Sequence, residues 1–323
     1  MWIWFPLACT QPKDRPPDHP TRIDTGAPTP TIDTGTTGGS TPTSPPTSDC
    51  DNLPIGPVPI SSFDITTTED FDFDALGYLV YSDGGSFRAA DAYGGNELVA
   101  PGIQDTRGIR ILSDGNVIAA YITEGRVGFT DRTTGGGNTL ISGLSGPNAL
   151  EVGAGDLVFV SETGGAPRVR AFDRTTLEET TVAGGFLYPN GLALSPDEQT
   201  LYVADSYAGI YKVAKDPGTG EWGERELLFD PADSYDGIET DRCGNVYTVG
   251  FTNGQVVRFN PETLESTLLY DIDDPAAFLF NAMRWGSGRG GWRRDVLYIT
   301  DRRVVFALEV GIEGPPQAVD NVP

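Results

Sequence analysis

The chain has 323 residues, enough to bury a large core, and its 41 Gly and 25 Pro favour strands and turns over helices. Lys and Arg number 22 against 46 Asp and Glu, and the resulting formal charge of −24 disfavours binding to nucleic acid or anionic lipid. The single histidine, His19, precedes the expected folded domain, which excludes histidine triads and histidine zinc sites there. The negative charge suits divalent cations, although simple solubility explains it equally well.

The chain begins with a short apolar run, MWIWFPLAC, that ends at Cys9. A cysteine preceded by Leu-Ala resembles the cleavage site of a bacterial lipoprotein signal, so residues 1–9 are predicted to be such a signal with Cys9 lipidated. The run is short and no Lys or Arg precedes it, and an ordinary apolar N-terminus is the alternative. This interpretation places the protein in the bacterial cell envelope, or outside the cell if Cys9 carries no lipid.

Residues 10–53 are rich in Thr, Pro, Gly and Ser. Such a composition cannot bury enough apolar surface to offset the entropy of ordering, so this segment is predicted to be a disordered tether. Cys50 stands near its end and Cys243 lies in a predicted turn, DRCGNV. A disulfide between Cys50 and Cys243 is plausible in an oxidising envelope, and two free cysteines are the alternative.

After the tether the sequence repeats a pattern of a polar residue, an apolar strand, a turn and a second strand. The six repeats start at Glu69, Arg107, Asn148, Asn190, Asp236 and Asn281. Successive starts are 38, 41, 42, 46 and 45 residues apart, the length of a four-stranded propeller blade. Residues 54–323 are therefore predicted to form an all-β, six-bladed β-propeller, with the segment PVPISSFDI beside the outer strands of the last blade. A pair of β-sandwiches is the competing fold.

The innermost strand of each propeller blade lines the central tunnel, so the six start residues are expected to form one ring at a tunnel end. The ring holds two carboxylates and three amides, with no Cys or His. Hard cations such as Ca²⁺ take carboxylate and amide oxygens, which predicts a divalent-cation site of Ca²⁺, Mn²⁺ or Mg²⁺ rather than zinc. Side chains of Asn and Asp that merely satisfy turn amides are the alternative.

At these residues the sequence resembles the senescence marker protein/gluconolactonase/luciferin-regenerating enzyme family of calcium-dependent, lactonase-like propellers. The resemblance covers roughly residues 60–312 and is strongest in PNGLALSPDEQTLYVADS and YDGIETDRCGNVYTV. The segment WGSGRGGW, followed by DVLYITDRR, is similar to the closing blade of bacterial members. Single blade motifs are shared with strictosidine-synthase-like and paraoxonase-like propellers, so the subfamily is less firmly indicated than the fold.

The resemblance implies roles for individual positions. Glu69 matches the first-blade metal glutamate, Asn190 the metal asparagine of the PNG segment, and Asp236 the metal aspartate that also serves as general base. Asn148 matches an asparagine near metal and substrate, although Ala149 replaces the usual Asp and Asp70-Phe71 replaces a small residue and proline.

Two further ring residues, Arg107 and Asn281, have no firm counterpart in the gluconolactonase branch and are interpreted as substrate-binding. Arg107 either steers an anionic substrate edge or forms a salt bridge to Glu69 or Asp236. The aromatic side chains of Tyr188, Tyr235 and Phe278 either wall the pocket or pack in the core.

Together these features predict a metal-dependent hydrolase of a lactone or ester, acting as a monomer on a small molecule. The ion polarises the carbonyl and Asp236 accepts the proton of the attacking water. The alternative is a non-catalytic envelope propeller whose calcium site is structural or vestigial and which binds a partner or small molecule.

Overall fold

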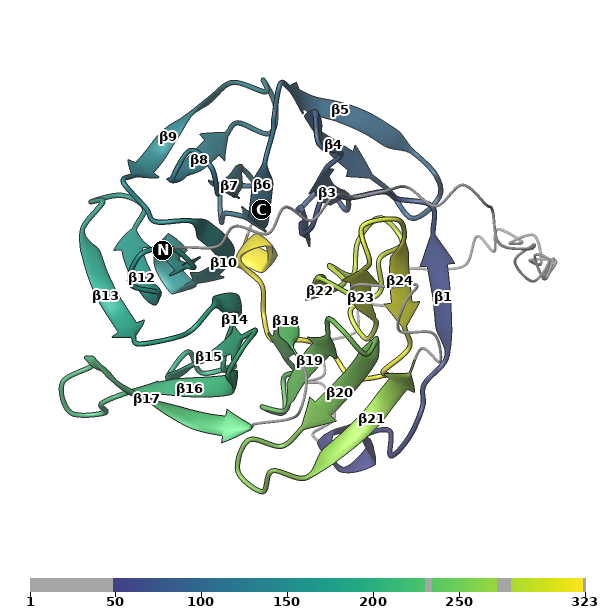
Figure 1. The fold of residues 1–323 in the computed structure, drawn as a ribbon. Coiled ribbons are helices and arrows are strands. Elements are labelled where there is room, and N and C mark those ends of the chain that lie inside the picture. The colour runs from purple at the N-terminus through teal and green to yellow at the C-terminus, as the bar shows by residue number, and fades with distance from the viewer. Residues whose placement is uncertain (1–48, 230–233, 272–279, 322–323) are drawn as a thin grey trace, which may run out of the picture. The chain divides into compact units, whose positions relative to one another are not determined.

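In a computed structural model the chain divides into two units, residues 1–45 and 46–323. The described residues are 49–229, 234–271 and 280–321, all within the second unit, so Cys9, His19 and Phe278 lie outside them. Six four-stranded antiparallel sheets follow one another around a ring, which confirms the predicted six-bladed propeller (Figure 1). Within the described ranges, no helix has the length and hydropathy that a membrane span requires.

The blades share one plan, in which the first strand lies at the tunnel and the fourth lies at the rim. Blade one consists of β2 (Phe71–Phe73), β3 (Leu79–Ser82), β4 (Ser86–Ala90) and β5 (Asn96–Pro101). Blade two consists of β6 (Thr106–Ile111), β7 (Val117–Tyr121), β8 (Arg126–Thr130) and β9 (Gly137–Ser142). Blade three consists of β10 (Pro147–Gly153), β11 (Leu157–Glu162), β12 (Arg168–Asp173) and β13 (Glu179–Gly184).

Blades four to six complete the ring. Blade four consists of β14 (Pro189–Leu194), β15 (Thr200–Asp205), β16 (Gly209–Lys215) and β17 (Trp222–Phe229). Blade five consists of β18 (Tyr235–Thr240), β19 (Val246–Gly250), β20 (Gln255–Phe259) and β21 (Ser266–Asp271). Blade six consists of β22 (Ala282–Trp285), β23 (Leu297–Thr300), β24 (Val305–Leu308) and β1 (Ile60–Phe63).

The ring closes through its N-terminal strand. β1 pairs antiparallel with β24, from Ile60 opposite Leu308 to Phe63 opposite Val305. The sixth sheet is therefore built from both ends of the domain, as the sequence predicted for PVPISSFDI. Closure of this kind leaves each blade packed between two neighbours, and buried aromatic and aliphatic side chains fill the space between blades, with Trp285, Trp292 and Tyr247 among the largest.

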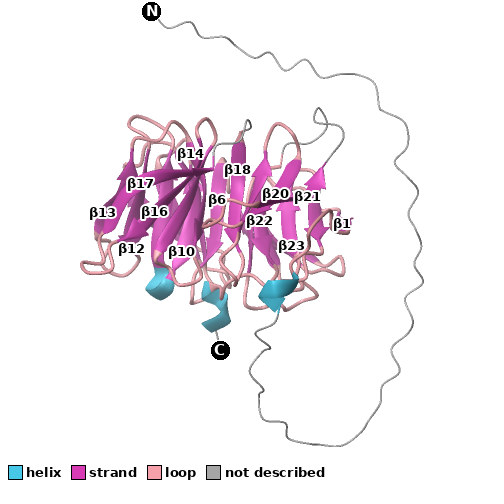
Figure 2. Cartoon of the chain, turned by 90° about the horizontal axis from the view of Figure 1, so that it is seen from below, coloured by secondary structure: helices cyan, strands magenta, loops and turns pink. Residues whose placement is uncertain are grey.

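Three short helices, η1 (Asp49–Asn52), η2 (Ala154–Asp156) and η3 (Ala318–Asn321), lie at the face where the inner strands end (Figure 2). η3 sits over the tunnel in the view along the axis (Figure 1). Gln317 donates from Nε2 to the carbonyl of Trp285 at 2.8 Å, and Arg294 pairs with Asp320. The C-terminal segment thus covers one end of the tunnel and leaves the other end as the candidate site.

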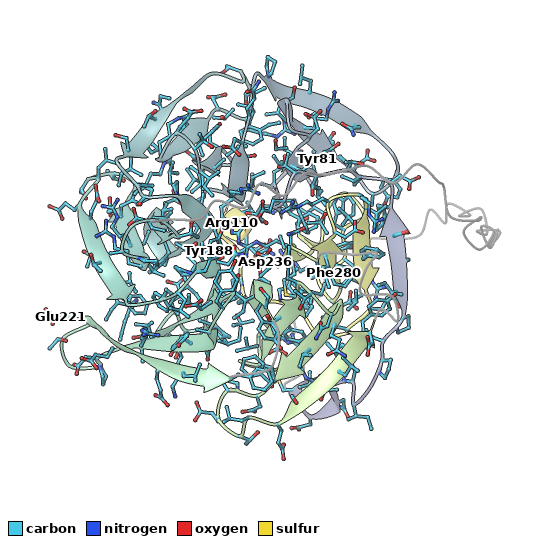
Figure 3. All side chains as sticks on the ribbon, viewed as in Figure 1. Tyr81, Arg110, Tyr188, Glu221, Asp236 and Phe280 are labelled. Atoms are coloured by element: carbon cyan, nitrogen blue, oxygen red, sulfur yellow. A yellow bond between two sulfur atoms is a disulfide. The ribbon has the colours of Figure 1, made fainter. Side chains whose placement is uncertain are left out.

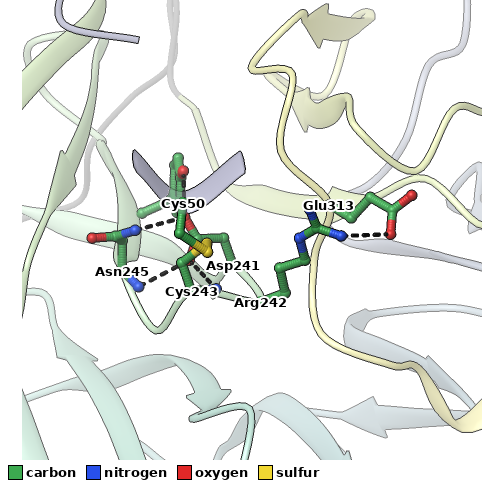
Figure 4. The surroundings of a disulfide bond; sticks show 7 residues. Cys50, Asp241, Arg242, Cys243, Asn245 and Glu313 are labelled. Carbon is green, nitrogen blue, oxygen red and sulfur yellow. Dashed lines mark hydrogen bonds and ion pairs between the residues drawn. A yellow bond between two sulfur atoms is a disulfide. The ribbon is translucent and has the colours of Figure 1, made fainter. Parts of the chain in front are cut away.

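A disulfide ties the beginning of the described chain to blade five. Cys50, in η1, is bonded to Cys243, in the turn between β18 and β19, across 193 residues of sequence (Figure 4). Asp241 accepts hydrogen bonds from the backbone of Cys243 and Asn245 and orders this turn. Residues 49–53, assigned to the tether from composition, therefore belong with the propeller.

Many of the acidic side chains stabilise turns. Asp131, Asp173 and Asp216 occupy the same place in blades two, three and four, at the end of the third strand, and each accepts two backbone N–H groups of its own turn. These hydrogen bonds lower the pKa of all three carboxyl groups. Part of the large negative charge therefore comes from carboxylates that stabilise turns, and this part gives no information about ligands.

Candidate functional site

The six residues at the starts of the repeats line one cavity at the open end of the tunnel. Glu69, Arg107, Asn148, Asn190, Asp236 and Asn281 border an empty volume of about 350 Å³, part of which is open solvent. Five of them also border a wider mouth of about 660 Å³. Figure 3 shows Asp236 and Tyr188 near the centre of the ring, with Arg110 close by. Side chains that lie up to 212 residues apart in sequence, from 69 to 281, therefore share one cavity.

A β-bulge turns four of these side chains toward the axis. In blade three, Pro147 pairs with Glu162 and Leu150 with Val160, so that Asn148 and Ala149 together face a single residue of β11. The same register shift occurs at Arg107, Asn190 and Asp236. Each is the second residue of its strand rather than the first, as the sequence pattern had suggested, and bulges commonly re-aim a side chain beside a functional site.

A glycine follows three of the ring positions, and it permits close approach of the next blade. A Cβ on Gly191 would overlap the carbonyl oxygen of Asp236, and one on Gly108 would lie 2.6 Å from the backbone nitrogen of Leu150. A Cβ on Gly237 would lie 3.0 Å from the carbonyl oxygen of Asn281. The Asn-Gly and Asp-Gly pairs therefore combine a polar ligand with the clearance that converging inner strands need.

Hydroxyl groups on the second strand of a blade, or directly after it, hold these bulges. Ser161 accepts from the backbone N–H of Ala149 at 2.9 Å and donates to the carbonyl of Asn190 at 2.9 Å. Ser206 donates to the carbonyl of Tyr235 at 2.8 Å, and Thr248 donates to that of Gly237 at 3.1 Å. Adjacent blades are thus linked directly beneath the ring. These hydroxyls are not among the site residues predicted from the sequence.

Asp236 is the ring carboxylate whose proton affinity is most altered. Its side chain is buried, with the residue 6% exposed, and burial raises its pKa to about 7, a shift that Asn281, Arg302 and Arg107 partly oppose. Asn281 donates from Nδ2 to Oδ2 of Asp236 at 3.1 Å. A carboxyl group with a pKa near neutrality can accept and release a proton at physiological pH.

Two amide side chains of the ring have a defined orientation. Asn190 donates from Nδ2 to Ser206 at 3.3 Å, which directs its amide oxygen away from that hydroxyl. Asn281 uses its Nδ2 for Asp236, and its Oδ1 is buried without a hydrogen-bond partner among the described residues. A buried acceptor of this kind costs free energy unless a ligand satisfies it.

Glu69 is paired with two arginines. Arg107 of β6 and Arg302 of the β23–β24 turn both contact its Oε2, the latter at 3.3 Å. Of the two roles predicted for Arg107, the salt bridge to Glu69 is present. Arg302 is a site residue that the sequence analysis missed, because it lies on a turn outside the phase of the repeat.

The mouth has an aromatic side. Tyr188 and Tyr207, whose ring centroids lie 5.4 Å apart, line it together with Phe251. Tyr188 thus takes the wall position proposed for it. Tyr235 instead packs in the buried cluster between blades four and five.

A second layer of charged side chains lies deeper in the tunnel. Charged residues follow the ring positions by three residues in five of the six blades: Asp72, Arg110, Glu151, Glu239 and Arg284. The bulge adds one residue to the usual alternation, so a spacing of three returns to the tunnel face. The spacing of three is therefore visible in the sequence, but it marks the tunnel face only once the bulge is known.

Ion pairs cross the tunnel through this layer. Arg284 pairs with Glu239, and with Glu151 at 2.8 Å; Arg110 pairs with Glu151 at 3.3 Å and with Asp70 at 2.7 Å. The network joins five blades and separates the candidate cavity from the end covered by the C-terminal segment.

The deep layer holds four carboxylates, Asp70, Asp72, Glu151 and Glu239, against two guanidinium groups. Burial raises the pKa of Glu151 to about 8 and that of Asp72 to about 6, and it raises the pKa of Glu239 well above its usual value.

The ring offers a donor set suited to a hard divalent cation. Carboxylate oxygens of Glu69 and Asp236, amide oxygens of Asn148 and Asn190, and the partnerless Oδ1 of Asn281 border the same cavity. Both arginines contact Oε2 of Glu69, so the ion pairs engage one of its two oxygens. In the described part of the chain no three His, Cys, Asp or Glu side chains form a metal-binding group, so amide oxygens must complete the set.

A sequence model of the SMP-30/gluconolactonase/LRE-like region matches residues 154–300. No curated protein matches the sequence. Solved structures with the same fold include a gluconolactonase from Xanthomonas campestris, with 20% identity, 82% of this chain and 93% of that chain covered, and a TM-score of 0.66.

Two other solved structures are similar over nearly their whole length. The calcium-binding protein regucalcin from Agrobacterium tumefaciens has 16% identity, covers 81% of this chain and 97% of its own, and gives a TM-score of 0.67. A luciferin-regenerating enzyme has 16% identity, covers 81% of this chain and 98% of its own, and gives a TM-score of 0.67. At these identities the likeness concerns the fold.

Proposed function

Because the chain carries an SMP-30/gluconolactonase/LRE-like region on a six-bladed propeller, we propose that it is a divalent-metal-dependent hydrolase of lactones or related esters. The convergence of Glu69, Asn190 and Asp236 on one cavity is the observation that supports this proposal most strongly. The gluconolactonase and regucalcin likenesses agree with a lactone substrate and with calcium.

Glu69, Asn190 and Asp236 would hold the ion, with Asn148 beside them. When bound, Ca²⁺, Mn²⁺ or Mg²⁺ supplies the Lewis acidity that polarises a carbonyl and stabilises the oxyanion. The described residues accommodate this role because all four ligands present oxygen and none presents sulfur or imidazole.

Asp236 is the proposed general base. Without the ion, burial raises the pKa of the Asp236 carboxyl group to about 7. With the ion bound, its carboxylate would lie beside the attacking water and accept the proton of that water. Asn281 holds one of its oxygens through Nδ2, which orients the carboxylate in the cavity. Asn148 and the free Oδ1 of Asn281 are positioned to bind hydroxyl groups of a substrate.

The deep ionic layer closes the inner end of the site. Arg110 borders both the candidate cavity and the space beneath it, and its pairs with Asp70 and Glu151 block the passage between them. Substrate and water therefore enter, and product leaves, through the mouth lined by Tyr188 and Tyr207.

The test is hydrolysis by the purified protein of a panel of γ- and δ-lactones and aryl esters, before chelation, after chelation, and after return of Ca²⁺, Mn²⁺ or Mg²⁺. Turnover should disappear on chelation and return with one of these ions. Asp236→Asn should lower kcat by about 100-fold or more. Asp131→Asn, which changes a turn carboxylate outside the tunnel, is the matched control.

A structural ion gives a different result. If chelation lowers the unfolding temperature while no lactone or ester is turned over, the non-catalytic propeller replaces this proposal. Turnover that survives both chelation and Asp236→Asn would remove the ion and this carboxylate from the mechanism.

We also propose that the protein works in an oxidising envelope compartment, tethered through residues 10–48 and lipidated at Cys9. The Cys50–Cys243 disulfide supports an oxidising location. Mass spectrometry of the protein from its native membrane, before and after Cys9→Ser, tests the lipid: an unmodified Cys9 would overturn the anchor.

A further inference from the structure

Two guanidinium groups meet at one carboxylate oxygen in the mouth of the site. Arg107 and Arg302 share Oε2 of Glu69, and Asp236 is the second carboxyl group that lines this mouth. We propose that these two arginines bind a negatively charged group of the substrate. The substrate is then a lactone or ester that carries a carboxylate or a phosphate. This inference rests on the proposed hydrolase function and names its substrate class.

The two guanidinium groups come from blades two and six. Arg107 lies in the bulge of β6, and Arg302 lies on the turn between β23 and β24. Both side chains line the mouth and are partly exposed, 32% for Arg107 and 41% for Arg302. A ligand can therefore reach them without displacing the core.

Arg302 is held in place by a constrained turn. Its backbone has φ 72°, a left-handed conformation that non-glycine residues adopt infrequently. The backbone N–H of Arg302 donates to Thr300 at 3.0 Å, and its carbonyl accepts from Thr67 at 3.1 Å. Thr67 lies two residues before Glu69, so these bonds fix Arg302 beside the ring.

The two arginines repel each other. The pKa of Arg107 is lowered, first by burial and next by the positive charge of Arg302. Each Nε is also buried without a hydrogen-bond partner among the described residues. A salt bridge to Glu69 alone needs one arginine. The second guanidinium group adds repulsion, which Asp236 offsets in part and an anionic ligand would offset further.

An aromatic wall of the same mouth suits the carbon skeleton of such a substrate. Tyr188, Tyr207 and Phe251 line that wall, and Tyr207 is 72% exposed. A small molecule with a carboxylate or phosphate at one end and a planar or apolar part at the other fits both sides.

Binding is tested without turnover. The protein is freed of metal on a chelating resin, and binding of benzoate, phenyl phosphate and neutral benzamide is measured by calorimetry at low ionic strength. We expect an anion to bind at least about tenfold more tightly than benzamide, and Arg107→Gln and Arg302→Gln each to weaken it by about tenfold or more. Arg303→Gln is the matched control, because this neighbour on the same turn pairs with Asp301.

Each outcome has one meaning. Preference for benzoate assigns a carboxylate, and preference for phenyl phosphate assigns a phosphate. Benzamide binding as tightly as either anion, or anion binding that is unchanged in both arginine variants, overturns the inference. Because no step requires hydrolysis, anion binding by a protein without turnover would reject the hydrolase and retain the anion site.

A second readout uses catalysis if turnover is found. For a matched pair of charged and neutral aryl esters, the ratio of kcat/KM values should fall by about tenfold in Arg302→Gln and stay unchanged in Arg303→Gln. A ratio that does not fall contradicts the assigned substrate class.

Discussion

Removal of Arg284 tests the ionic layer that floors the site. The Arg284 residue is 6% exposed, and its guanidinium group pairs with Glu239 and with Glu151, both in the tunnel. Arg284→Met keeps much of the side-chain volume and leaves two buried carboxylates without this partner. Loss of one partner from a buried ion pair costs about 3–5 kcal/mol of unfolding free energy.

The penalty should grow with pH. Burial already raises the pKa of Glu151 to about 8, above its usual 4.5, so its contribution to stability is present at low pH and is lost as pH rises through about 8. Without Arg284 the folded-state pKa of Glu151 and of Glu239 rises further. Arg284→Met should therefore be more destabilising at pH 8.5 than at pH 6.

The assay is urea denaturation at both pH values with the disulfide intact. Arg293→Met is the control, because Arg293 is 53% exposed and its pair with Asp295 should contribute about 1 kcal/mol or less. The double variant Arg284→Met, Glu239→Gln should recover part of the loss. If Arg284→Met costs no more than Arg293→Met at either pH, the ionic layer does not stabilise the propeller as reasoned.

Replacing both Cys50 and Cys243 by Ser should lower the unfolding free energy by about 2–5 kcal/mol, because the bond closes a loop of 193 residues; an unchanged urea midpoint would contradict this. Gly191→Ala should destabilise the protein by about 1–3 kcal/mol and weaken Ca²⁺ binding, because the new Cβ overlaps the Asp236 carbonyl. Gly56→Ala, with no atom within 4 Å of the added Cβ, is its control. Ca²⁺ uptake should release most of one proton at pH 6 and almost none at pH 8.5, because the pKa of Asp236 is about 7. Calorimetry in buffers of different ionisation enthalpy measures the number of protons released. Equal release at both pH values would exclude Asp236 as a ligand of the ion.

The fold could be predicted from the sequence because each sequence repeat corresponds to one structural unit. Each repeat is one blade whose apolar faces are covered only by neighbouring blades, so spacing and strand pattern recur together. The ring positions followed from the same phase, and they converge as expected. The closing strand β1 was also predicted, from an apolar segment with no blade of its own.

The remaining features of the site depend on local geometry that a repeat pattern does not specify. A bulge shifts the tunnel face by one residue, and without it Glu151 and Glu239 read as solvent-facing strand positions. Arg302 is on a turn, where the repeat phase is lost, and only three-dimensional proximity pairs it with Glu69. Pairing of Cys50 with Cys243 likewise required the closed ring.

Calcium binding by calorimetry is the most direct test of the central claim, that ring side chains from separate blades hold one ion. The purified protein should bind one Ca²⁺ per chain with a dissociation constant of about 1 mM or tighter. Glu69→Gln, Asn190→Ala and Asp236→Asn should each weaken binding by about tenfold or more, while Asp131→Asn should not change it. A protein that takes up no Ca²⁺, or one whose affinity survives all three ring substitutions, would contradict the account.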